Sequence, residues 1–208
     1  MPRDASDTRA RLLDAAEELF AQHGIHAVAT SEIVSAAGQR NASAVSYHFG
    51  SRDDLLWALL VERDAPVDAE RGNALEALGT RPTPTGLLNA LVGPYAACLH
   101  THGGRNYLRI VDQVREGFHE WRSVPPRAQP NLATALGMLE ERMGGLDPDV
   151  QQERLIAMMM LMTSSAAVRA QRIEGGQPPA LAHADYVENL TAMLSGVVEA
   201  PKVQALVQ

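Results

Sequence analysis

Thiols are almost absent from this chain of 208 residues, because Cys98 is its only cysteine. One thiol cannot build an internal disulfide framework, nor a metal site made of several thiolates. Long apolar runs are also missing. The longest, Leu155 to Met162, falls well short of the roughly 20 residues that a bilayer-spanning helix needs. The polar N-terminus carries no segment typical of a secretory leader. We therefore expect a protein of the reducing cytoplasm.

Strand-length alternation of apolar and polar residues is lacking as well, whereas helical spacing recurs along almost the whole chain. The composition, 46% hydrophobic and 21% charged, is ordinary for a soluble globular protein. These patterns predict an all-α fold.

Two helices are predicted before residue 40. The first has one apolar face and is followed by Gly24, which suits the left-handed conformation that ends helices. The second is short, because Thr30 or Ser31 can cap its start and Gly38 ends it. The apolar face of the first helix consists of Leu12, Ala16, Leu19 and Phe20.

A third and a fourth helix follow at once. Asn41 is a good N-cap for a short helix from Ala42 to Phe49, with Val45 and Phe49 as core anchors. Residues 51–54 read as a capping box that opens the fourth helix. Its apolar face consists of Leu55, Leu56, Leu59 and Leu60.

Proline and glycine divide the rest of the chain. Between these residues the sequence predicts helices at about 67–79, 85–102, 105–121, 131–143, 148–174 and 183–198. We expect two domains, a small one over residues 1–51 and a larger one over residues 52–208.

Two short helices joined by a tight turn, after an amphipathic helix, are typical of a helix-turn-helix domain. The second short helix of such a domain enters the major groove of DNA. With Val45 and Phe49 buried, we expect small or hydrogen-bonding side chains on the outward surface, where they can approach base edges and phosphates. They are Ser43, Ala44, Ser46, Tyr47 and His48.

Three features together resemble the TetR family of regulators: the run Ala15 to Phe20, the spacing of Gly24, Thr30, Ile33 and Gly38, and the run Tyr47 to Leu56. The resemblance covers about residues 8 to 60. This chain departs from the usual pattern in the connection after Gly38 and at Ser46, where relatives carry tyrosine.

The resemblance implies two sets of DNA contacts. Thr30, Tyr47, His48 and Arg52 would bind phosphates, whereas Arg40, Ser43, Ala44 and Ser46 would lie near bases; Asn41, between Arg40 and Ser43, is counted with the interface. Alternatives stay open for three residues: Tyr47 as a half-buried strut, His48 as a surface filler, and Arg52 as a partner of Asp53 or Glu62.

Positive charge is scarce for a protein that binds DNA. The net charge is −7, and Lys202 is the only lysine. From Gly24 to Arg52 two arginines face the single acid Glu32, a balance of +1. DNA binding must therefore depend on a few well-placed groups.

For the larger domain, the resemblance implies a dimer interface formed by the last two long helices and a ligand cavity among the preceding ones. A helix over Leu155 to Met162 would be apolar on every side, so a partner chain is a natural cover, with a plain intramolecular core as the alternative. Aromatic and flexible side chains suit a cavity, and we expect Tyr95, Tyr107, Trp121 and Met159 to line it. Arg105 and Arg109 can meet an acidic ligand or form a solvated face.

Enzyme signatures are weak. His100 and His102 lie two residues apart, on different faces of a helix, and no oxyanion loop or orienting acid accompanies Cys98. We expect neither catalysis nor a cofactor or metal. The sequence favours a homodimeric repressor that a small-molecule effector releases from double-stranded DNA. The alternative is a helical ligand-binding or adaptor protein with little affinity for DNA.

Overall fold

The computed structural model describes residues 3–114 and 129–201. Its elements, in order, are α1 (Arg3–His23), the 3-10 turn η1 (Ile25–Ala27), α2 (Thr30–Ala36), α3 (Ala44–Phe49), α4 (Arg52–Ala77), α5 (Pro84–Ala97), the 3-10 turn η2 (Cys98–His100), α6 (His102–Gln113), α7 (Pro130–Arg142), α8 (Pro148–Glu174) and α9 (His183–Val198). These residues contain no strand, so the all-α prediction is confirmed. None of their helices combines the length and hydrophobicity of a bilayer span.

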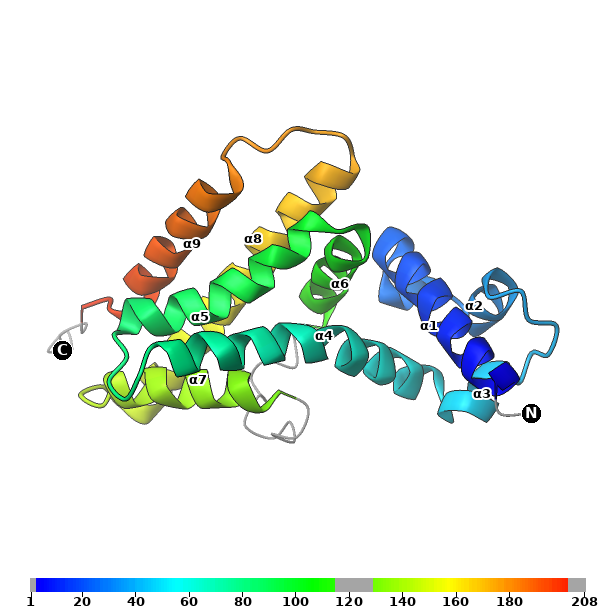
Figure 1. Ribbon diagram of the computed structural model, residues 1–208, viewed down its shortest axis with the longest axis horizontal. Coiled ribbons are helices and arrows are strands. Elements are labelled where there is room, and N and C mark those ends of the chain that lie inside the picture. The colour runs from blue at the N-terminus through cyan, green and yellow to red at the C-terminus, as the bar shows by residue number, and fades with distance from the viewer. Residues whose placement is uncertain (1–2, 115–128, 202–208) are drawn as a thin grey trace, which may run out of the picture.

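The helices form an elongated molecule with α1, α2 and α3 at one end (Figure 1). The long helix α4 leaves this end and runs along the molecule to α5 and α7. Helix α6 packs between α1 and α8, and α9 packs on α5 and α8. One continuous apolar core extends from Leu12 in α1 to Val198 at the end of α9.

Helix α4 passes through Pro66 without a break, so the predicted helix start at residue 67 is wrong. A proline inside a helix removes one hydrogen bond and costs about 3 kcal/mol. Pro66 is itself exposed, but Asp64, Val67 and Asp68 on either side of it are buried against neighbouring helices. Tertiary packing on both sides of the proline therefore offsets its local cost.

The bounds predicted for the last two helices, 148–174 and 183–198, are confirmed. The start of α8 follows from a local signal, because the Asp147 side chain accepts a hydrogen bond from the backbone N–H of Asp149 at 2.9 Å. Helix α6 begins at His102 rather than residue 105, because Thr101 caps it. It ends at Gln113, with Val114 at the cap position, so the single helix predicted to residue 121 is wrong; residue 121 itself lies outside the described residues.

Candidate DNA-binding interface

Local hydrogen bonds fix the turn between α2 and α3. The Glu32 carboxylate accepts from the backbone N–H of Ala29 at 2.7 Å and closes the start of α2. Gly38 has a φ of +67°, a backbone conformation that residues with a side chain rarely adopt, and the chain turns there. Asn41 Oδ1 then accepts from the backbone N–H of Ser43 at 3.0 Å and from its hydroxyl at 2.7 Å. These contacts hold α3 in a defined position after α2.

Three expectations about these helix starts were wrong. Ala29, not Thr30 or Ser31, occupies the cap position of α2, and Glu32 supplies the capping oxygen. Helix α3 begins at Ala44, two residues later than predicted, because Asn41 caps the preceding turn. The later start turns Ala44 inward beside Val45, and it is only 6% exposed. Ala44 is therefore not placed to touch a thymine methyl group.

The outward surface of α3 and its turn carries polar side chains. Ser46 is exposed, and Tyr47 is 80% exposed, so Tyr47 is not a half-buried strut. The ring of His48 is half-buried and lies edge-to-face with Tyr47 at a centroid distance of 5.0 Å. In the turn, Arg40, Asn41 and Ser43 are exposed. Thr30, the first residue of α2, is half-buried.

Arg52 faces its own protein. Its guanidinium donates to the backbone carbonyl of Val28 at 3.3 Å and to that of Ile25, and it lies 5.1 Å from the centre of the Phe20 ring. Asp53, an alternative partner in the sequence, lies 3.8 Å away. Arg52 thus ties the start of α4 to η1 and α1, a role that its position at a helix start does not reveal.

Comparison with known families identifies this end of the molecule. Residues 12–59 match the family model described as bacterial regulatory proteins of the tetR family. This segment is therefore similar to the TetR family. A comparison with curated proteins found no significant match.

Solved structures resemble the whole chain. A TetR-family transcription regulator from Marinobacter aquaeolei VT8 aligns with a TM-score of 0.59 and 16% identity, over 95% of this chain and 98% of the other. A TetR-family regulator from Streptomyces coelicolor A3 aligns with a TM-score of 0.53 and 17% identity, over 93% and 96%. At this identity the likeness establishes the fold. Together with the family match, it supports a DNA-binding transcriptional regulator.

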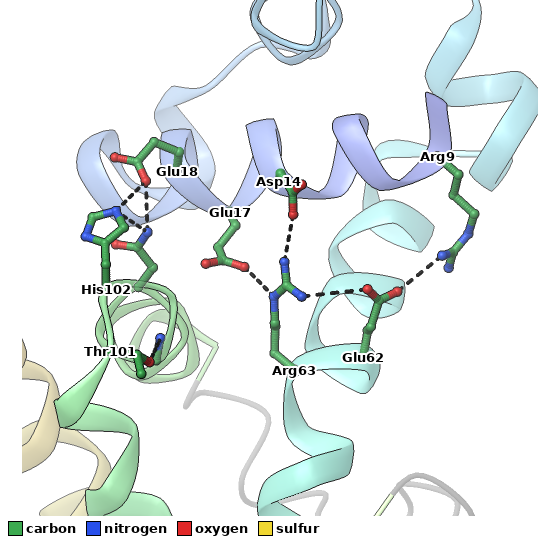
Figure 2. Close-up of polar contacts among 10 residues, drawn as sticks. Arg9, Asp14, Glu17, Glu18, Glu62, Arg63, Thr101 and His102 are labelled. Atoms are coloured by element: carbon green, nitrogen blue, oxygen red, sulfur yellow. Dashed lines mark hydrogen bonds and ion pairs between the residues drawn. The ribbon is translucent and has the colours of Figure 1, made fainter. Parts of the chain in front are cut away.

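Ion pairs join α1 of this TetR domain to α4 (Figure 2). Arg63 contacts Asp14 at 2.9 Å and also pairs with Glu17, whose side chain is only 8% exposed. Nearer the N-terminus, Arg9 pairs with Glu62 at 3.2 Å. The sequence analysis missed these pairs, because the partners lie 46 to 53 residues apart.

A second polar cluster joins α1 to α6 (Figure 2) and extends to α8 through Glu174. His102 Nε2 lies 2.9 Å from the Glu18 carboxylate, and His102 Nδ1 lies 3.2 Å from that of Glu174. Asn106 also donates to Glu18, at 2.9 Å. Arg105 pairs with Glu174, so it does not form the free solvated face considered from the sequence. This cluster connects α1 to α6 and α8.

The larger domain contains a buried polar centre around two predicted ligand residues. Tyr95 and Tyr107 are buried edge-to-face, with ring centroids 6.1 Å apart. The Tyr107 hydroxyl donates to Asp64 at 2.6 Å, and Arg71 lies 3.5 Å from the same carboxylate. Burial raises the pKa of Asp64, although Arg71 opposes the shift. Tyr95 Oη, Asp64 Oδ2 and Arg71 Nε have no hydrogen-bond partner among the described residues.

Asp68 completes this centre and caps α7. Its carboxylate accepts from the backbone N–H groups of Asn131 at 3.1 Å and Leu132 at 2.9 Å, and it lies 3.3 Å from Arg71. Gln129, at the cap position of α7, makes no side-chain capping hydrogen bond. The α4 carboxylate therefore takes the place of a local cap.

The remaining predicted residues fall in different places. Met159 is buried in α8, and Trp121 lies outside the described residues. Burial raises the pKa of the Cys98 thiol to about 11, which disfavours the reactive thiolate at neutral pH. In the described part of the chain, no three histidine, cysteine or acidic side chains gather as a metal site.

Proposed function

We propose that this chain is a homodimeric repressor that binds an inverted-repeat operator through two copies of α3 and leaves it when a small molecule binds the larger domain. The observation that carries the proposal is the polar surface of α3. Tyr47 and Ser46 point to solvent while Ala44 and Val45 anchor the helix in the core. Such a helix can enter the major groove without moving the domain beneath it.

Arg40, Asn41, Ser43 and Ser46 are assigned to the base edges, and Thr30, Tyr47 and His48 to phosphates. Arg52 is assigned mainly to holding the domain together, since its guanidinium is already occupied by backbone carbonyls. The functional boundary is placed between residues 51 and 52, where α4 begins.

Dimerisation is assigned to α8 and α9. Met160 and Val168 on α8 and Met193 on α9 are large apolar side chains left exposed in the single chain, at 41%, 56% and 41%. A second copy would cover them, whereas Leu155, Met158 and Met162 are already buried within one subunit. The apolar α8 run is thus divided between an internal core and an outer face.

Effector sensing is assigned to the centre of Tyr95, Tyr107, Asp64 and Arg71, with Met159 and Trp121 as further contacts. Its three unpartnered polar atoms support this assignment, because buried polar groups are rarely left without a partner. The ion pairs from α1 to α4 and α6 offer a route by which rearrangement of this centre moves α3.

Selection of bound sequences from random duplex DNA tests the proposal and should recover an inverted repeat. Arg40→Ala should weaken binding by roughly tenfold or more, since a direct base contact contributes about 1–3 kcal/mol. Arg81→Ala is the matched control, because Arg81 is an exposed arginine in the loop after α4, at the opposite end of the molecule (Figure 1). Failure to enrich any sequence would overturn the DNA-binding proposal and favour the second candidate, a ligand-binding or adaptor protein, which the net charge of −7 supports.

A further inference from the structure

A cavity of about 320 Å³ lies where η2, the end of α8 and the start of α9 meet. We call it the α8–α9 cavity. Leu99, Ile173 and Leu181 form apolar parts of its wall, and His100, Arg169 and His183 add nitrogen-bearing side chains. Its volume is at the lower end of the range of about 300–1,000 Å³ for small-molecule sites. The cavity thus suits a small, partly apolar ligand.

The cavity is electropositive. The rings of His100 and His183 lie 4.2 Å apart, and the Arg169 guanidinium lies 4.3 Å from the centre of the Tyr186 ring. No carboxylate belongs to the cavity wall, and none of the side chains of His100, Arg169 and His183 forms an ion pair with the described residues. Burial lowers the pKa of His183, and the charges of His100 and Arg169 lower it further. A bound anion would face the permanent charge of Arg169 and would favour protonation of His183 beside it.

Backbone and side-chain donors add to the same preference. Helix α9 begins at the cavity, and the cap residue, Ala182, offers no side-chain acceptor for the first N–H groups of this 16-residue helix. Asp185 in the first turn already faces the positive end of the helix dipole, but the first backbone N–H groups remain available as hydrogen-bond donors to an anion. Arg169 donates to the carbonyl of Leu181 at 2.7 Å, which holds the guanidinium in place, while its buried Nε has no partner in the described part of the chain.

We propose that the α8–α9 cavity binds a small amphipathic organic anion, an aliphatic carboxylate whose chain lies on Leu99, Ile173 and Leu181 and whose head group lies between Arg169 and His183. This site goes beyond the proposed function and shares no residue with the buried centre of Tyr95 and Tyr107. Carboxylate and guanidinium form strong charge-assisted hydrogen bonds, and the apolar wall adds hydrophobic affinity.

Calorimetric titration of the full chain with octanoate, 1-octanol and octylamine tests the required chemistry. The three probes share an alkyl chain and differ in head-group charge. Octanoate should bind at least tenfold more tightly than either of the others. Equal affinity for octanoate and 1-octanol would overturn the proposal, because the cationic side chains would then contribute nothing.

The variant His183→Asp tests whether octanoate binds in the α8–α9 cavity. It places a carboxylate at the first residue of α9, where an acid favours the helix, so the fold should be retained. The affinity of this variant for octanoate should fall at least tenfold, and its affinity for octylamine should rise. His26→Asp is the matched control, since it makes the same change of charge at an exposed position in η1 and should leave octanoate binding unchanged.

Arg169→Gln provides a second measurement if His183→Asp does not fold, and it should also weaken octanoate at least tenfold. Unchanged octanoate affinity in the folded variants would overturn the proposal, because the ligand would then occupy another site. No DNA is present in these titrations, so their outcome is independent of whether the chain binds an operator.

Discussion

The imidazole of His102, in the first turn of α6, lies 2.9 Å from the carboxylate of Glu18 in α1 (Figure 2). It lies 3.2 Å from the carboxylate of Glu174 on its other side. Hydrogen bonds to these two carboxylates raise the pKa of His102, and the contact with His102 lowers the pKa of Glu18. The contact between the DNA-binding end and the larger domain therefore depends on pH.

The first prediction concerns this contact. Because the pKa of His102 is raised in the folded state, its stabilisation is fully present below its ordinary pKa of about 6.5 and is lost as pH rises through the raised value. His102→Gln should lower the free energy of unfolding by about 0.5 kcal/mol at pH 5.5, a small effect because the ion pairs are exposed, and by nearly nothing at pH 9.

Urea denaturation at the two pH values, at fixed protein concentration, measures this difference. His23→Gln is the control, because His23 is exposed at the end of α1 and forms no ion pair with the described residues. An equal effect of His102→Gln at both pH values would contradict the assigned electrostatic contact.

The second prediction compares a buried with an exposed ion pair between α1 and α4. Arg63→Met leaves the buried Glu17 carboxylate without its partner and should cost about 2 kcal/mol of stability. Adding Glu17→Gln to the Arg63→Met variant should restore part of the lost stability. Arg9→Met, which breaks an exposed pair with Glu62, should cost less than about 0.5 kcal/mol. Equal losses in the two single variants would show that the burial of Glu17 has no energetic effect.

The third prediction concerns the cap that α4 provides for α7. Asp68→Ala removes two backbone hydrogen bonds and one of the acidic neighbours of the buried Arg71, so it should cost about 3 kcal/mol. Asp147→Ala removes an exposed, local cap of α8 and should cost only about 1 kcal/mol. Thermal unfolding at matched protein concentrations measures both losses. Similar shifts of the unfolding temperature in the two variants would refute the role of Asp68 as the cap of α7.

These contacts show which features a sequence can reveal. The bounds of α8 and α9 were predictable because capping and proline signals lie next to them in the chain. The cap of α7 was not, since Asp68 and Leu132 are 64 residues apart. The passage of α4 through Pro66 was not predictable for the same reason. Packing from helices distant in the sequence outweighs the local cost of the proline.

The candidate interface divides in the same way. The exposed position of Tyr47 followed from helical periodicity, whereas the burial of Ala44 depended on a helix start two residues later than the capping signal of Asn41 indicated. The inward orientation of Arg52 could not be foreseen, because its partners are backbone carbonyls, which no residue type marks.

The last prediction separates the roles of Arg40 and Arg52 by DNA affinity, its salt dependence and stability. The logarithm of DNA affinity falls with the logarithm of salt concentration with a slope of about −0.9 per phosphate contact. If two groups neutralise phosphate charges in each of two subunits, the slope should be about −3.6, shallow for a regulator. Arg40→Ala should lower the affinity at every salt concentration and leave the slope nearly unchanged, because Arg40 is assigned to base edges. Arg52→Gln should instead lower stability by about 1–2 kcal/mol, because it removes donors to the carbonyls of Ile25 and Val28, and should leave the slope unchanged. A shallower salt slope in the folded Arg52→Gln variant would show that Arg52 contacts phosphates and would contradict the structural role assigned to it.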